Sequence, residues 1–503
     1  MNLRAVVRML GIVLLLIAGF LLVPALVALI YDEVREFWAC VLSAALSAAV
    51  GGFLAWWNRS STKAVHGRPD YFRREGLAVV GLSWLVGGVA GALPYMFTGT
   101  FSSFVDALFE SVSGLTTTGS TVLSPEGIDA LPMSIAFWRS FTHWLGGFGI
   151  VMVFVVIFPT GGRSLFRSEV PGIAREAGRQ RVRDSALALM RIYVGISVIE
   201  FVLLYLAGMT VFDSVIHTFG TIATGGFSNH SESIAYFQSV QIEMIITVFM
   251  FVSGINFAIY DVLLRVGPRP AWRRFIGSAE ARAYAGIIFG STVFIACVLW
   301  FWGGSNGDVG SGLPDYRHFW QAMRDSVFQV VCLETSTGYG TADFDRWPQV
   351  CRVLLMLIAV IGACAGSTGG GMKVVRILIV AKAALNGVRR FVRPRAIHAV
   401  RMDGQTLDEG IVASVTSYFA LWIFVFLGGT LFLSGYGYDL ATSSTAVLAT
   451  LNNIGPGLAK VGPAMNFAEL PDLGKLLLTV FMVLGRLEFY AVVALFVPSF
   501  WRR

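Results

Sequence analysis

The chain of 503 residues is 55% hydrophobic and only 14% charged. Because soluble globular proteins carry about 25% charged residues, this composition excludes a soluble globular protein, a disordered chain, a secreted disulfide scaffold and a DNA-binding protein. The net charge is +7, and its meaning depends on where the basic residues lie. We therefore expect a polytopic membrane protein, with the lipid bilayer and no nucleic acid among its partners.

Ten stretches are long and apolar enough to cross a bilayer, which takes about 20 residues. Glu200 interrupts one of them, and Arg486 and Glu488 interrupt another. The expected spans cover residues 9–31, 37–58, 76–105, 140–162, 192–212, 244–260, 285–307, 353–372, 411–438 and 476–501. The first exceeds the apolar region of a signal peptide, about 7–15 residues, so we expect it to be retained. The pattern predicts an all-α fold with ten transmembrane helices.

Basic residues gather between alternate spans. The most basic of these loops, before span nine, contains Lys373, Arg376, Lys382, Arg389, Arg390, Arg393, Arg395 and Arg401. In contrast, residues 98–135 on the opposite side contain four acidic residues and no Lys or Arg. Since basic loops face the cytoplasm, both termini are expected there. The basic loops either set this orientation alone or also dock an acidic partner or anionic lipid.

Four outer loops, after spans three, five, seven and nine, resemble one another. They read TTTGS at 116–120, ATGGF at 223–227, TSTGYG at 335–340 and NNIGPG at 452–457. Their first glycines follow one another at intervals of 106, 113 and 117 residues, and a long regular period indicates duplicated units. Each loop follows a segment of about a dozen residues, too short to cross the bilayer. Each unit thus reads as spanning helix, short helix, loop, spanning helix.

The short segments and their loops have the chemistry of a cation site. Three segments begin with Asp106, Asp213 and Asp325, which we expect to be helix N-caps. Each helix then directs its partly negative C-terminal end at its loop. Gly permits positive φ, so successive carbonyls can replace the hydration shell of potassium. A single Thr-Gly pair is usually a turn, but the matching spacing in four loops argues against that alternative.

At these loops the sequence resembles the Trk/Ktr/HKT superfamily of potassium transporters, most closely the bacterial TrkH type. Residues 362–373 (GACAGSTGGGMK) and 485–489 (GRLEF) support the resemblance. It covers nearly the whole chain and implies four tandem helix–pore-loop–helix units around one pore, plus two N-terminal helices. The expected segments are 1–60 for the two N-terminal helices and 71–165, 180–266, 280–386 and 405–503 for pore units one to four, the third with a broken second helix.

The resemblance also implies which residues form the selectivity filter. Carbonyls that bind K+ are expected from Thr117, Thr118, Gly119, Ala223, Thr224, Gly225, Ser336, Thr337, Gly338, Asn453, Ile454 and Gly455. The fourth loop departs most from the potassium-channel pattern. In plant relatives, Ser in place of the first filter Gly accompanies sodium preference. All four positions are Gly here, which favours potassium.

A gate is expected in span eight. Its glycines weaken a helix by about 1 kcal/mol each, and its Ser and Thr compete for backbone bonds. The resemblance implies a loop across the pore beneath the filter, formed by Gly366, Ser367, Thr368, Gly369, Gly370 and Gly371. It also places Arg486 just below the filter, as a barrier to cations. The alternatives are a Gly-rich packing face for the loop, and for Arg486 a structural pair with a distant carboxylate such as Glu200.

The expected function is potassium uptake across the bacterial inner (plasma) membrane, not enzymatic catalysis. The resemblance implies K+ as the transported ion, no organic cofactor, a homodimer and a cytosolic nucleotide-binding regulatory subunit of the TrkA type. Residues 366–373 superficially match a phosphate-binding loop, but the required Gly-Lys-[Ser/Thr] run is missing. The alternative function is a proton- or sodium-coupled symporter that uses Glu200. Against it, Glu200 stands alone and the four units run in the same sense, without inverted repeats.

Overall fold

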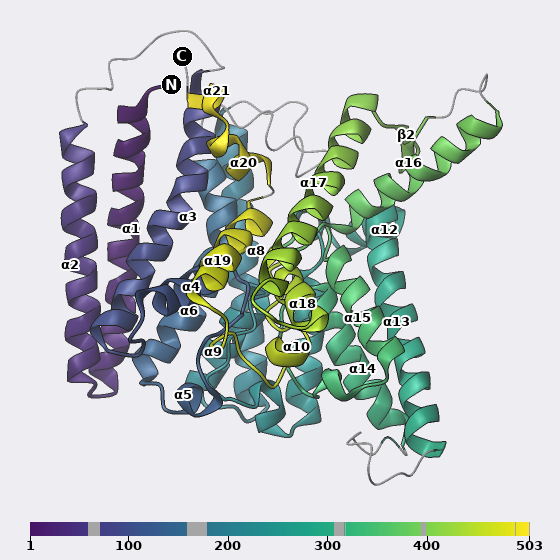
Figure 1. The fold of residues 1–503 in the computed structure, drawn as a ribbon, viewed down its shortest axis with the longest axis horizontal. Coiled ribbons are helices and arrows are strands. Elements are labelled where there is room, and N and C mark those ends of the chain that lie inside the picture. Colours follow the sequence, from purple (N-terminus) through teal and green to yellow (C-terminus); the bar gives the residue numbers. More distant parts are fainter. Residues whose placement is uncertain are drawn as a thin grey trace.

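The computed structural model describes residues 1–58, 71–157, 179–305, 316, 318–393, 399–487 and 489–501. Glu488 and the basic residues of 59–70 and 158–178 lie outside these ranges. Within them the regular elements are helices and one antiparallel hairpin of β1 (Arg401–Met402) and β2 (Gln405–Thr406). The two termini lie at the same end of the molecule (Figure 1).

Two long helices form one edge of the molecule, α1 (Leu3–Ile30) and α2 (Val34–Trp57) (Figure 1). They pack through glycine: a Cβ atom at Gly11 would lie 2.6 Å from the carbonyl oxygen of Gly51, and one at Gly51 would lie 2.7 Å from that of Gly11. Small residues that let backbones approach are typical of helix pairs in lipid. Large side chains on the outward faces, such as Leu26 and Trp57, are exposed, as expected for contact with lipid.

After α2, the order spanning helix, short helix, loop and second helix occurs four times in the described chain. The spanning helices are α3 (Tyr71–Phe97), α8 (Arg179–Leu206), α13 (Ala279–Ser305) and α17 (Glu409–Ser434). The short helices are α4 (Phe104–Leu115), α9 (Val211–Ile222), α14 (Phe319–Glu334) and α18 (Leu440–Leu451). The second helices are α6 (Met133–Ile157), α10 (Val240–Ser253) with α11 (Phe257–Val266), α15 (Gln349–Ile361) with α16 (Val374–Val392), and α19 (Asp472–Arg486) with α20 (Tyr490–Phe496).

The remaining elements are short connections. They are α5 (Pro125–Asp129), η2 (Ser233–Phe237), α12 (Pro268–Gly277), η3 (Phe344–Arg346), η4 (Ala459–Val461) and α21 (Pro498–Trp501).

Six helices in the described ranges are long and apolar enough to cross a membrane, and the bent pair α10–α11 makes a seventh. The six are α1, α2, α3, α8, α13 and α17, so six of the expected spans are helices long and apolar enough to cross a membrane. Span four, expected at 140–162, extends beyond residue 157, where the described range ends. Three others are not continuous helices. Span six bends by 92° between α10 and α11, span eight is interrupted over residues 362–373, and span ten is interrupted between α19 and α20. The interruptions coincide with Gly254, the glycine-rich segment and Leu487, where the regular helical bonds end.

The N-termini of the short helices differ from the expectation. Asp106 and Asp213 are not N-caps, because Ser103 and Thr210 cap α4 and α9. The two acids occupy the first helical turn instead, where a negative charge also favours the helix dipole. Asp325 lies further inside α14, which begins at Phe319. In the fourth unit Asp439 caps α18.

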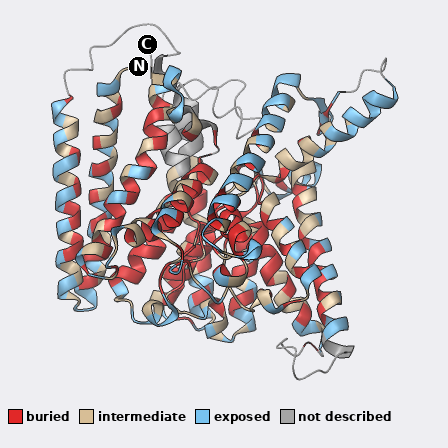
Figure 2. Cartoon of the chain, in the orientation of Figure 1, coloured by how far each residue is buried: buried red, intermediate tan, exposed pale blue. Residues whose placement is uncertain are grey.

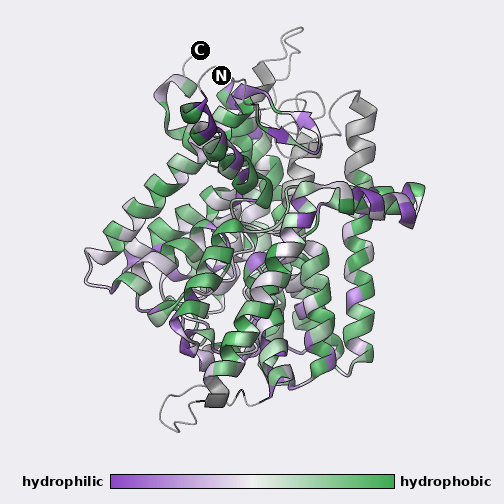
Figure 3. Ribbon diagram, turned by 90° about the vertical axis from the view of Figure 1, so that its right-hand side faces the viewer, coloured by the Kyte–Doolittle hydropathy of each residue, from purple (hydrophilic) through white to green (hydrophobic). Residues whose placement is uncertain are grey.

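The short helices lie in the buried centre of the molecule, and the long helices surround them (Figure 2). Only 11% of the most apolar stretch of α17 is buried, and 33% of those of α1 and α2. Apolar residues cover most of the helical ribbon (Figure 3). Large apolar side chains that face outward from the long helices suit a lipid environment. The chain is therefore a multi-pass membrane protein.

The glycine contact between α1 and α2 can be tested by adding one methyl group. Gly51→Ala should cost about 1–3 kcal/mol, because the new Cβ would overlap the backbone of α1. The measurement is the midpoint of thermal unfolding in detergent. Gly52→Ala is the matched control, since no atom lies within 4 Å of a Cβ there. Equal midpoints for the two variants would contradict the packing.

Candidate functional site

The four loops after the short helices share one backbone conformation. Each begins with a non-glycine residue at left-handed φ, a region that few such residues adopt. These are Thr117 (53°), Thr224 (55°), Ser336 (59°) and Asn453 (54°). Two residues later each loop has a glycine with positive φ: Gly119 (81°), Gly226 (81°), Gly338 (85°) and Gly455 (101°). The fourth loop thus keeps the conformation although its sequence departs most from the others. Strained backbone at matching places indicates a functional site.

Each loop is fixed to its own short helix by the same hydrogen bond. The N–H after the left-handed residue donates to a carbonyl five residues earlier. The four bonds are Thr118 to Ser113 (2.9 Å), Gly225 to Gly220 (2.8 Å), Thr337 to Cys332 (2.8 Å) and Ile454 to Ala449 (2.8 Å). Each short helix therefore directs its C-terminal, partly negative end at its loop.

The four loops contact one another in a closed ring. A Cβ atom at Gly119 would lie 2.1 Å from the carbonyl oxygen of Gly225, and one at Gly226 would lie 2.0 Å from that of Thr337. One at Gly338 would lie 2.1 Å from the oxygen of Ile454. The ring closes because a Cβ at Gly455 would lie 3.1 Å from the oxygen of Thr118 in the first loop. At each junction the glycine of one loop faces an equivalent carbonyl of the next.

The second loop is shifted by one residue from the expected register. By φ and by hydrogen bonding, the counterparts of 117–119 are Thr224, Gly225 and Gly226, so the expected set beginning at Ala223 starts one residue too early. Two consecutive glycines made the sequence ambiguous here. Gly226 is the residue with positive φ (81°). Gly225 is required for a different reason, because it lies against the His143 ring, where a Cβ would be 2.4 Å from Cγ.

A side chain on each short helix holds the chain just beyond the loop. Nine residues before the positive-φ glycine stand Glu110, His217 and Gln329 in units one to three. Glu110 Oε2 accepts from Val122 N at 3.0 Å, His217 Nε2 lies 3.2 Å from Ser228 Oγ, and the amide oxygen of Gln329 accepts from Thr341 N at 3.0 Å. In unit four the place holds Ala446, and the adjacent Thr445 Oγ1 accepts from Leu458 N at 2.9 Å. We call these four side chains the clamp residues.

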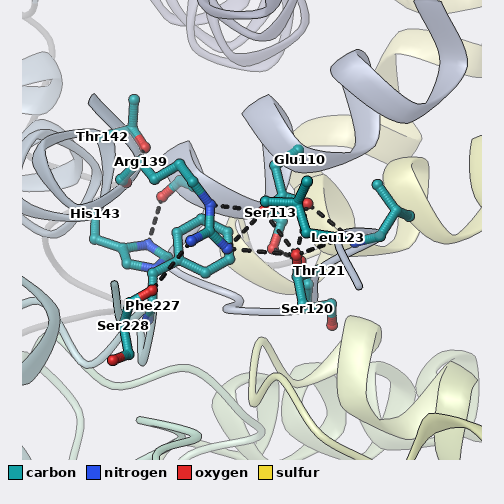
Figure 4. A network of polar contacts seen from close by, with 12 residues as sticks. Glu110, Ser113, Ser120, Thr121, Leu123, Arg139, Thr142, His143, Phe227 and Ser228 are labelled. Carbon is teal, nitrogen blue, oxygen red and sulfur yellow. Dashed lines mark hydrogen bonds and ion pairs between the residues drawn. The ribbon is translucent and has the colours of Figure 1, made fainter. Parts of the chain in front are cut away.

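The clamp of the first unit is a buried ion pair (Figure 4). Arg139 Nη2 lies 2.7 Å from Glu110 Oε1, and the two side chains are 2% and 0% exposed. The same guanidinium donates from Nη1 to the carbonyl of Ser228 at 3.1 Å and stacks 4.1 Å from the centre of the Phe227 ring. Arg139 therefore joins the first loop to the second.

His143 makes a second connection between these two loops (Figure 4). Its Nδ1 lies 2.8 Å from the carbonyl oxygen of Gly114, and its Nε2 accepts from Phe227 N at 3.2 Å. This pattern of one donor and one acceptor requires the tautomer with its proton on Nδ1. No pattern in the sequence indicated that His143 and His217 contact the loops.

The glycine-rich segment 362–373 lies against the ring. Gly370 N donates to Ser336 Oγ at 2.6 Å, and a Cβ at Gly370 would lie 2.4 Å from the carbonyl oxygen of Asn452. The segment therefore meets the third and fourth loops at the C-terminal side of their short helices. Its other edge fits the break between α10 and α11, where Cys364 N donates to the carbonyl of Gly254 at 3.0 Å. We call residues 362–373 the intramembrane loop.

Arg486, at the end of α19, is 6% exposed and contacts the intramembrane loop. Its Nη1 donates to the carbonyl of Thr368 at 2.8 Å, and its Nη2 donates to that of Gly146 on α6 at 3.2 Å. Both acceptors are backbone carbonyls from other units. Glu200, the alternative partner considered from the sequence, is fully buried on α8, and its carboxylate oxygens have no hydrogen-bond partner among the described residues. The arrangement thus brings Arg486 and the expected gate residues together.

The ion pair of Glu110 and Arg139 should contribute strongly to stability. Glu110→Ala would leave the Arg139 charge buried without its carboxylate, which costs about 3–5 kcal/mol. Asp261→Ala is the control, because Asp261 pairs with Arg265 at an exposed site, where a pair contributes about 1 kcal/mol or less. Thermal unfolding of both variants in detergent measures the difference. A loss no greater than that of the control would show that the buried pair is dispensable.

Known proteins resemble the chain over its full length. Residues 41–503 match the family model TrkH, described as a cation transport protein. The chain is 38% identical over 508 residues to the Trk system potassium uptake protein TrkH of Escherichia coli (strain K12), with 100% of both sequences covered. It is 36% identical to TrkH of Halomonas elongata, again over 100% of both. The crystal structure of the potassium transporter TrkH from Vibrio parahaemolyticus matches with a TM-score of 0.87 and 35% identity, and 100% of each chain is covered. This chain belongs to the TrkH family of cation transport proteins.

Proposed function

We propose that the chain takes up potassium through a pore enclosed by the ring of four loops. The observation that carries the proposal is the repeated left-handed backbone of loops that contact one another in a closed circle. The relatives named above are potassium uptake proteins, which agrees with this function. The proposed carbonyl donors are Thr117, Thr118, Gly119, Thr224, Gly225, Gly226, Ser336, Thr337, Gly338, Asn453, Ile454 and Gly455.

Selection of potassium follows from the geometry of the ring. A dehydrated K+ needs several carbonyl oxygens in place of its water shell, and four loops supply them without a charged side chain. The C-terminal ends of α4, α9, α14 and α18 add partial negative charge. Since the clamp residues hold the chain beyond each loop, the ring resists shrinking around the smaller Na+. Glu200, the candidate for coupling to protons or sodium, is buried on α8 and is not among the proposed carbonyl donors of the ring.

The proposed topology has ten spans in the bacterial inner membrane. Counting α6 and each interrupted second helix as one span adds four to the six continuous ones. The segment 1–60 then forms the N-terminal pair, and 71–165, 180–266, 280–386 and 405–503 form the four pore units. The basic loops favour a cytoplasmic location for both termini.

We propose that the intramembrane loop and Arg486 close the pore on the cytoplasmic side. The loop contacts the ring through Ser336 and Asn452, and the Arg486 charge beside it opposes a cation. The loop continues directly into α16, which projects from the body of the molecule (Figure 1). A cytosolic nucleotide-binding subunit of the TrkA type would open the pore by moving α16. A homodimer is the proposed assembly.

If the ring of loops is the selectivity filter, a side chain at Gly119 should change its selectivity between potassium and sodium. Gly119→Ser would push the Gly225 carbonyl, which leaves no space for a Cβ. We expect the ratio of rubidium to sodium uptake in proteoliposomes to fall about tenfold, equivalent to 1.4 kcal/mol. Gly437→Ser is the matched control, because Gly437 also has positive φ (88°) but no atom within 4 Å of a Cβ. An unchanged ratio in folded Gly119→Ser protein would remove this carbonyl from the filter.

If Arg486 helps to close the pore, it should limit the flux of cations. Arg486→Ala should raise rubidium uptake in the absence of a regulatory subunit about tenfold, the effect of lowering a barrier by 1.4 kcal/mol. The control is Arg265→Ala, because Arg265 is exposed on α11 and distant from the loop in sequence. Lower flux from a correctly folded Arg486→Ala protein would show that Arg486 supports the open pore instead.

A further inference from the structure

The carboxylate of Glu280 contacts both ends of the intramembrane loop. Glu280 is the second residue of α13, and its Oε1 accepts from Ala365 N at 2.6 Å. The same carboxylate also interacts electrostatically with the backbone N–H of Val375, in the first turn of α16. Ala365 lies near the start of the loop and Val375 lies just after its end. One side chain from another helix therefore fastens the loop at two points.

The contact with α16 completes a helix end that lacks its own cap. The N-cap residue of α16 is Lys373, whose side chain makes no capping hydrogen bond. The first N–H groups of a helix need acceptors and carry partial positive charge. Glu280 supplies a negative acceptor there and also interacts electrostatically with Lys373. Carboxylate bonds to backbone N–H groups are about twice as strong as neutral ones, so these bonds set the position of α16 relative to α13.

The position of Glu280 itself depends on the hairpin that follows α16. Ala279 N, at the start of α13, donates to Asp403 Oδ1 in the hairpin turn at 2.7 Å. The hairpin is bound to α16 in turn, because Lys382 Nζ donates to the carbonyl of Arg401 at 2.9 Å. A movement of α16 therefore reaches Glu280 by two routes, directly at Val375 and indirectly through the hairpin.

We propose that Glu280 is a positioning residue that latches the intramembrane loop in its closed place. Displacement of α16 weakens the interaction of Glu280 with Val375, breaks its bond to Ala365 and frees the loop to leave the pore. The inference rests on the gating role proposed above and adds the residue through which that gate is released. Glu280 touches neither the ring nor the ion, and acts only through the loop backbone.

The test compares Glu280→Ala, Glu280→Gln and wild type in proteoliposomes without a regulatory subunit. Glu280→Ala removes the bond to Ala365 and the interaction with Val375, and should raise rubidium uptake about tenfold. Glu280→Gln keeps a neutral acceptor and should give an intermediate rise of about threefold. Glu409→Ala is the matched control, an exposed acidic residue at the start of α17, and should leave uptake unchanged. Deuterium exchange of the peptide covering 362–372 should accelerate in the same order.

The outcomes distinguish the proposed role of Glu280 from the proposed gating role of the intramembrane loop and Arg486. If Arg486→Ala raises flux but folded Glu280→Ala changes neither flux nor exchange, the latch is wrong and the gate stands. If neither variant raises flux, the proposed gate fails. If Glu280→Ala does not fold, Glu280→Gln decides alone, and wild-type flux together with wild-type exchange overturns the latch. A variant that only weakened the fold would accelerate exchange throughout the chain instead of at residues 362–372.

Discussion

Irregular backbone inside a membrane must have its polar groups paired or facing water or an ion, and the architecture depends on this constraint. Four such loops meet at the centre of the molecule. Each loop N–H bonds to its own short helix, and a clamp residue fixes the chain beyond. The left-handed residues cost of order 1–3 kcal/mol each. The left-handed conformations persist because these hydrogen bonds hold the backbone in place. The loop carbonyls then remain available for an ion.

The four units use different side chains to hold the chain beyond the loop in place. A buried ion pair anchors the first, an imidazole the second, an amide the third and a hydroxyl the fourth. Such divergence is open to units joined in one chain, whereas identical subunits must share one solution. It also distributes the remaining tasks, since the third unit supplies the intramembrane loop and the fourth supplies Arg486.

The interrupted second helices fit into one another beside the ring. The break between α10 and α11 provides the carbonyl of Gly254 for Cys364 of the intramembrane loop, and the end of α19 provides Arg486 for Thr368. Each broken helix thus exposes backbone groups that another break satisfies. The mutual pairing explains how several interruptions can coexist at membrane depth, and it makes the intramembrane loop of one unit depend on the helices of two others.

The sequence by itself determined the membrane class, six continuous spans, the four repeated loops and the glycine-rich interruption, because apolar length, period and glycine content are local properties. Polar residues stand nine positions before the loop glycine in three units, at Glu110, His217 and Gln329, but this spacing is recognisable only once Gly226 is known to be the equivalent glycine. Only the tertiary structure decided that Gly226 rather than Gly225 takes the positive-φ place. It alone paired Glu110 with Arg139 and Glu280 with Ala365, because these contacts join helices 29 and 85 residues apart in sequence. Which groups meet across such distances depends on how whole helices pack, and no local pattern records it.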